Sequence, residues 1–136
     1  MFDLSTLAVE ERKPNLRKET QERLTLLCLR YNVSVKLKWS NGRRRGVFLK
    51  NERIVLLGPR AWNQPIPTLL HLFAHIICDD RCRDSRNHSY RFCETLWKLV
   101  IEAYKSPARY PWYGEHNSVF NFGRNRCKAY VSDRDF

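Results

Sequence analysis

Residues 67–78 have the sequence PTLLHLFAHIIC, and the predicted fold is built outward from them. His71 and His75 are four positions apart among apolar residues. Side chains at this spacing lie on one face of an α-helix, one turn apart. Pro67 suits the first turn, where a backbone N–H has no partner in the helix. The stretch therefore predicts a buried helix from Pro67 to about Cys78 that carries two imidazoles on the same side.

A third histidine, His88, follows a charged loop and begins a second predicted helix that continues to about Tyr104. Imidazole nitrogens are common zinc ligands, and three protein ligands leave the fourth position of zinc open. The spacing therefore predicts a zinc site made by His71, His75 and His88. The competing interpretation makes them core histidines whose nitrogens are hydrogen-bonded within the protein.

The residues before this stretch predict one helix and three strands. Asn15 is a suitable N-cap for a helix that continues to Tyr31. Alternating apolar and polar residues, or a short apolar run, then indicate strands. The strands are expected at residues 33–39, 46–50 and 53–57. Asn41-Gly42 is typical of a hairpin turn, and the third strand is apolar enough for a central position. We expect an α+β fold in which a small antiparallel meander packs on helices.

The length of 136 residues suggests one domain spanning residues 1–136. We divide this domain into a leader at 1–14, a core at about 15–105 and a basic, aromatic tail at 106–136. No apolar run is long enough to cross a membrane, and the acidic N-terminal segment is unlike a signal peptide. We therefore expect an intracellular protein, either cytoplasmic or nuclear.

The five cysteines are odd in number and include no C-x-x-C pair, so free thiols are expected. Cys78 and Cys82 lie one turn apart at the end of the histidine helix. They are alternative metal ligands, although a buried free cysteine commonly serves as a small hydrophobic residue.

The chain has a formal net charge of +11, with 25 lysines and arginines against 14 acidic residues. A basic balance of this size favours nucleic acid, or an acidic or nucleic-acid-bound protein, as the partner rather than a membrane. The candidate phosphate-binding residues are Arg43, Arg44, Arg45, Arg81, Arg83 and Arg86. Aromatic and basic residues also alternate in the tail, as in surfaces that bind single strands. The alternative is an arginine-rich surface that only increases solubility.

The order of helix, strands, histidine helix, loop and helix resembles the minimal zincin core, most closely that of the SprT-like metallopeptidases. In that family a strand precedes an L-x-H-E-x-x-H helix, and a third histidine follows in an H-G-x-x-F context. Here LHLFAH at residues 70–75 matches the H-E-x-x-H part of the first motif except at the Glu, and HSYRF at 88–92 matches the second except at the Gly. The resemblance covers about residues 15–105. It implies zinc held by the three histidines and, as in nuclear members, peptidase activity on DNA-bound proteins.

Leu72 stands where the family has the glutamate that acts as general base. We therefore predict a catalytically inactive zinc-binding module for nucleic acid or a nucleic-acid-associated protein. One alternative is an active zinc hydrolase with a relocated base. Candidates for that base, a fourth ligand or an oxyanion donor are Glu94, Glu115, His116, Tyr110 and Tyr113. Another alternative is a metal-free interaction or inhibitor protein of a mobile element.

Overall fold

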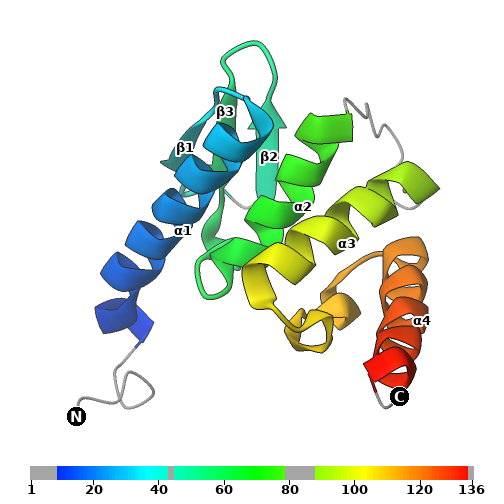
Figure 1. Cartoon of the computed structure of the whole chain (residues 1–136). Coiled ribbons are helices and arrows are strands. Elements are labelled where there is room, and N and C mark those ends of the chain that lie inside the picture. Colours follow the sequence, from blue (N-terminus) through cyan, green and yellow to red (C-terminus); the bar gives the residue numbers. More distant parts are fainter. Residues whose placement is uncertain (1–8, 43–44, 79–87, 135–136) are drawn as a thin grey trace. The chain divides into compact units, whose positions relative to one another are not determined.

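The computed structural model describes residues 9–42, 45–78 and 88–134 (Figure 1). The main elements are α1 (Val9–Tyr31), β1 (Lys36–Trp39), β2 (Gly46–Leu49), β3 (Ile54–Leu57), α2 (Pro65–Cys78), α3 (Tyr90–Tyr104) and α4 (Asn117–Arg134). Short 3-10 turns are η2 (Pro59–Ala61), η3 (Pro107–Arg109) and η4 (Trp112–Gly114). The predicted α+β class, with a small sheet packed on helices, is confirmed. Two compact units, residues 1–72 and 73–136, divide the chain within α2.

In the first unit the three strands form a mixed sheet in the order β1-β3-β2. The central position predicted for β3 is confirmed, and its residues Val55 and Leu57 are fully buried. The predicted antiparallel meander is wrong, because β1 runs parallel to β3 and only β2 is antiparallel to it. In register, Lys36 lies opposite Ile54 in the parallel pair, and Leu49 lies opposite Ile54 in the antiparallel pair.

The connections explain this topology. The hairpin joins β2 to β3 through residues 50–53, where Arg53 has a left-handed φ of 57°. The Arg53 carbonyl accepts from the Lys36 N–H at 2.9 Å, which places the start of β1 beside β3. Asn41-Gly42 therefore forms no hairpin loop. The Gly42 N–H instead donates to Ser40 Oγ at 3.0 Å in a local turn.

Helix α1 begins at Val9, so Asn15 lies inside the helix and the prediction that it is the N-cap is wrong. Pro14 removes one backbone donor, but its fixed φ is helical and the helix continues through it. The predicted single buried face is confirmed, since Thr20, Leu24 and Leu27 are buried while Leu29 is 76% exposed. None of the helices in the described part of the chain has the length and hydropathy needed to span a membrane.

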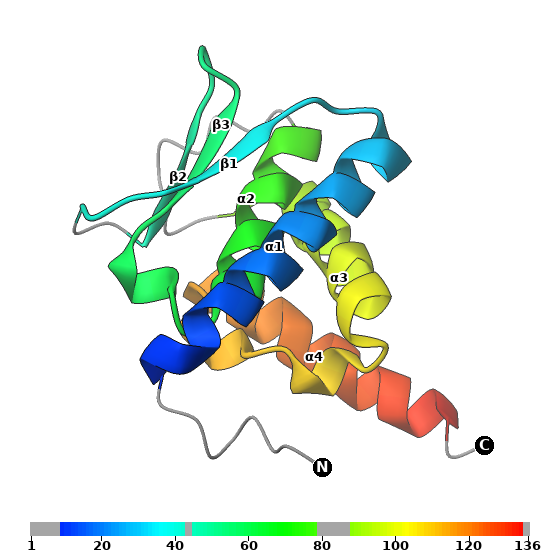
Figure 2. The same cartoon turned by 90° about the vertical axis from the view of Figure 1, so that its left-hand side faces the viewer.

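Helices α1 and α2 are attached to the sheet by specific contacts (Figure 2). The Arg17 guanidinium of α1 lies 4.8 Å from the Trp39 ring of β1, a cation–π contact. On the α2 side, a Cβ added to Gly46 of β2 would lie 2.8 Å from Thr68 Cγ2 and 3.1 Å from Leu72 Cδ1. The absence of a side chain at Gly46 therefore lets α2 approach β2, and the Leu72 side chain reaches this strand.

In the second unit α3 begins one residue after Ser89, whose Oγ accepts from the Phe92 N–H at 3.1 Å. His88 therefore precedes the helix cap, which corrects the prediction that it opens the helix. The buried side of α3 includes Phe92, Leu96 and Val100. The left-handed Lys105 ends the helix.

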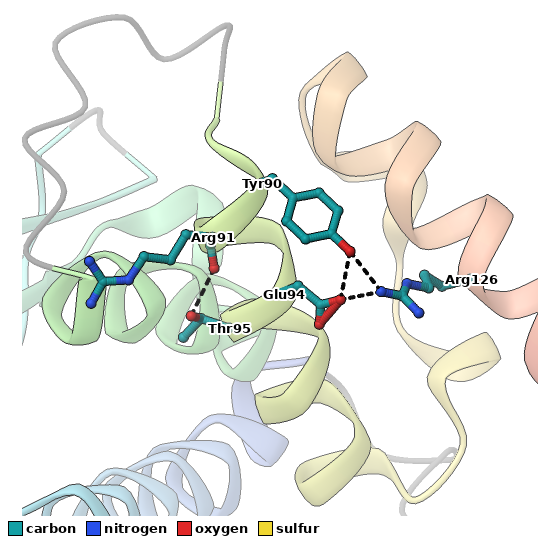
Figure 3. Close-up of polar contacts among 5 residues, drawn as sticks. All are labelled: Tyr90, Arg91, Glu94, Thr95 and Arg126. Carbon is teal, nitrogen blue, oxygen red and sulfur yellow. Dashed lines mark hydrogen bonds and ion pairs between the residues drawn. The ribbon is translucent and has the colours of Figure 1, made fainter.

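The segment predicted as a basic, aromatic tail contains η3, η4 and α4, of which the sequence pattern predicted none. The buried Trp112 donates from Nε1 to the Pro107 carbonyl at 2.8 Å. A Cβ added to Gly123 of α4 would lie 2.3 Å from the Trp112 ring, so α4 meets that ring at a glycine. Arg126 of α4 also pairs with Glu94 of α3 (Figure 3).

Gly46→Ala is expected to destabilise the protein by about 1–3 kcal/mol, because the new methyl group overlaps Thr68 and Leu72. No glycine in the described residues has a positive φ, so the cost comes from crowding rather than from backbone strain. The measurement is the midpoint of urea unfolding. Gly42→Ala is the control, since among the described residues its Cβ would meet Ser40 Oγ alone, at 3.2 Å. Equal midpoints for the two variants would contradict the close approach of α2 to β2.

Candidate metal site

The helix α2 orients two of the three predicted ligands. Its fully buried residues include Leu69, Leu70, Phe73 and Ala74. His71 and His75 are half-buried and lie one turn apart beside this buried face. Pro65 and Pro67 occupy the first turn, where they remove no helical hydrogen bond. Burial of the apolar face therefore determines the direction of both imidazoles.

The third histidine meets them from the segment before α3. One ligand nitrogen from each of His71, His75 and His88 lies within 4.8 Å of the other two. Nitrogens bound to one tetrahedral zinc at about 2.0–2.1 Å are about 3.4 Å apart, so the rings need only a small further approach. The three histidines therefore lie close enough to bind a metal ion, as the sequence predicts.

Phe92 holds two of these rings in place. Its ring centroid lies 4.2 Å from that of His75 and 4.4 Å from that of His88. The His75 and His88 centroids are 5.1 Å apart. His88 is only 8% exposed, and its backbone N–H donates to Ser118 Oγ at 3.2 Å. Packing against Phe92 and a backbone hydrogen bond thus orient His75 and His88.

Two nitrogens of the cluster differ from those of ordinary core histidines. The Nδ1 atoms of His75 and His88 are buried and make no hydrogen bond in the described part of the chain. Both residues have other contacts, including those to Phe92. The interpretation as hydrogen-bonded core histidines is therefore not supported at these two atoms.

Leu72, at the position where the H-E-x-x-H motif has a glutamate, lies against the sheet. Leu72 is half-buried, and its Cδ1 is one of the atoms nearest to the space beside Gly46. An aliphatic side chain at this position neither accepts nor donates a proton. Helix α2 therefore carries two candidate ligands, while Leu72 can serve as no general base.

The two carboxylates considered as relocated bases have partners of their own. Glu94 pairs with Arg126 and accepts from the Tyr90 hydroxyl at 3.0 Å (Figure 3). Glu115 accepts a hydrogen bond from the Tyr110 hydroxyl. Neither carboxylate belongs to the ligand cluster found among the described residues.

The remaining candidates differ in position. The exposed His116 stacks on His88, with ring centroids 5.4 Å apart and an interplanar angle of 19°. Tyr110 is buried and bound to Glu115, whereas Tyr113 is 77% exposed. Of these three, His116 has a ring contact with His88, which belongs to the cluster.

The cysteines lie outside this cluster as far as they are described. Cys78 Sγ lies 3.2 Å from Thr95 Oγ1 of α3, and Cys82 is outside the described residues. Burial, followed by the charges of Glu115 and Glu94, raises the pKa of Cys93 to about 11. The neutral thiol is then the stable form near pH 7, which disfavours Cys93 as a nucleophile or metal ligand.

Of the arginines predicted to bind phosphates, Arg45 is exposed at the start of the β2 strand. Arg43, Arg44, Arg81, Arg83 and Arg86 lie outside the described residues. The contacts by which Phe92 and Ser118 hold His88 were not predicted from the sequence. For Phe92 a signal was present, since it ends the HSYRF motif, but for Ser118 no local pattern exists.

A scan of protein-family models and searches of curated proteins and of solved structures find no match for this chain. The resemblance to the SprT-like metallopeptidases stays a prediction from the motif residues.

Proposed function

We propose that this protein binds zinc through His71, His75 and His88 and acts as a catalytically inactive binding module for nucleic acid or a nucleic-acid-associated protein. The observation that carries the proposal is that one ligand atom from each of three histidines, two on α2 and one in the segment before α3, lies within 4.8 Å of the other two. The inactive, SprT-like character rests on the motif at 70–75 and on Leu72 within it.

The donor set favours zinc over harder cations. The cluster consists of nitrogen donors alone, whereas calcium and magnesium prefer oxygen ligands. Three imidazoles suit zinc, although copper, nickel and iron also accept them. A bound zinc ion would supply Lewis acidity at this position. The residues of the chain provide the orientation, through Phe92 and the buried face of α2.

The missing carboxylate supports the inactive assignment. Loss of a general base lowers the rate by about 10²- to 10⁴-fold. Leu72 packs toward Gly46, and both Glu94 and Glu115 have other partners. The ligands of a metallopeptidase are therefore retained while its proton-transfer group is absent.

The nucleic-acid part of the proposal rests on charge. The net charge of +11 favours polyanions through release of counterions from phosphates. Arg45 is exposed beside Arg43 and Arg44 in the sequence. Phosphate contacts from such a cluster would bind the backbone without reading its base sequence.

The metal proposal predicts one zinc ion per chain. Each of His71→Ala, His75→Ala and His88→Ala is expected to weaken zinc binding by about 100-fold or more, since even loss of an outer-shell partner costs up to 100-fold. Competition titration with a chromophoric chelator measures the affinity. Tyr113→Ala, at an exposed side chain, is the control and should bind zinc normally. A variant with all three histidines replaced by Ala should not bind zinc at this site. If its zinc affinity equals that of the unmodified chain, the proposed site is wrong.

The inactive assignment predicts that the unmodified protein does not cleave an unfolded protein substrate, with or without zinc. Leu72→Glu restores a carboxylate, and Leu72→Gln is its uncharged control of similar size. Any cleavage gained should appear only in Leu72→Glu and should stop when chelator is added, because the amide cannot take up a proton. Chelator-sensitive cleavage by the unmodified protein that His71→Ala abolishes would instead establish an active hydrolase with a relocated base.

If Arg43, Arg44 and Arg45 contact phosphates, affinity for nucleic acid should fall steeply with salt. Replacing Arg43, Arg44 and Arg45 by Ala should weaken binding and flatten the dependence of log affinity on log salt concentration. Fluorescence anisotropy with a labelled oligonucleotide measures both. The control removes the same charge from dispersed exposed positions, by replacing Lys18, Arg60 and Lys98 with Ala. Absence of binding by the unmodified protein at low salt, or equal slopes for both variants, would exclude the predicted interface.

A further inference from the structure

We propose that His116 is the fourth ligand of the metal site, so that the bound ion is enclosed by protein nitrogens and links the start of α4 to α2. This inference rests on the zinc site proposed above. It turns the open position expected of a peptidase-like site into a closed, structural one. The ion would then hold the C-terminal segment rather than bind a substrate.

Ring separations are the first support. Two imidazoles on one tetrahedral zinc ion have their ring centroids about 5.2 Å apart, because each centroid lies about 3.2 Å from the ion. His75 and His88, both in the cluster, are separated by 5.1 Å. The ring centroid of His116 lies 5.4 Å from that of His88. The separation between His88 and His116 is therefore close to that expected for a ligand pair.

The backbone beside His116 is already anchored to a ligand. Ser118 follows His116 by two residues, and its Oγ accepts a hydrogen bond from the backbone N–H of His88 at 3.2 Å. The His116 carbonyl accepts from the Phe120 N–H at 2.8 Å at the beginning of α4. These bonds place the Cα of His116 beside His88 before any ion binds.

Only the side chain has to move. His116 is not among the residues whose ligand atoms already lie within 4.8 Å of one another. Its ring is exposed, and an exposed side chain changes rotamer rapidly and at low cost. The neighbouring Glu115 is held by Tyr110 and does not compete for the same position.

The absence of a base agrees with this assignment. An open fourth position is useful when a polar group can activate what binds there, and Leu72 offers none. A fourth imidazole instead excludes solvent from the ion. Closed sites contribute directly to folding stability.

The test uses cobalt(II) in place of zinc, because its visible spectrum reports ligand number and type. In the unmodified protein we expect a four-coordinate spectrum that azide does not change. His116→Ala should open the site, so that azide alters the spectrum and zinc affinity falls by about 10- to 100-fold. His116→Cys should restore affinity and add a thiolate charge-transfer band, whereas His116→Gln should behave like His116→Ala.

A second readout follows the C-terminal segment. Zinc should slow backbone hydrogen exchange in residues 116–129 of the unmodified protein, and this protection should disappear in His116→Ala while protection around His75 remains. The assignment is overturned if His116→Ala and the unmodified chain share one cobalt spectrum, one azide response and one zinc affinity. In that case, if His75→Ala still loses zinc binding as expected, the proposal of a zinc site made by three histidines stands. No metal binding by the unmodified chain would remove the zinc site itself.

Discussion

Burial of one face of α2 is the constraint on which the candidate site depends. Leu69, Leu70, Phe73 and Ala74 are fully buried. Their burial fixes the orientation of the helix about its own axis. That orientation places His71 and His75 one above the other at the edge of the buried face. It also directs Leu72 toward β2, where Gly46 leaves room for the approach. The same packing that aligns two ligands therefore places an aliphatic residue where a peptidase needs its base.

The site combines the regular spacing of a helix with contacts between residues that are distant in sequence. The spacing of His71 and His75 could be read directly, because a helical period relates them. Their meeting with His88 was predicted from the resemblance of HSYRF to a known motif and is confirmed as a cluster. The contacts that hold His88, from Phe92 and Ser118, depend on the arrangement of α3 and the start of α4. No short sequence motif predicts that arrangement.

The same distinction applies to the fold. The apolar run of β3 predicted its central place between β1 and β2, although only Val55 and Leu57, on one face, are fully buried. The parallel pairing of β1 with β3 was missed, since Asn41-Gly42 carries a hairpin signal that the topology does not use. Helix α4 was also missed. Its position depends on the approach of Gly123 to Trp112 and on the pairing of Arg126 with Glu94. These contacts join residues that are distant in sequence and leave no helical pattern of apolar residues.

The most direct test of the central claim is the X-ray absorption spectrum of the zinc-loaded protein. The account predicts one zinc ion per chain, surrounded by imidazole nitrogens at about 2.0–2.1 Å and by no sulfur. This result requires the histidines to act together and leaves Cys78 and Cys82 out of the site. A first shell with sulfur at about 2.3 Å would assign the metal to cysteines instead. Failure to retain zinc after gel filtration would contradict the account altogether.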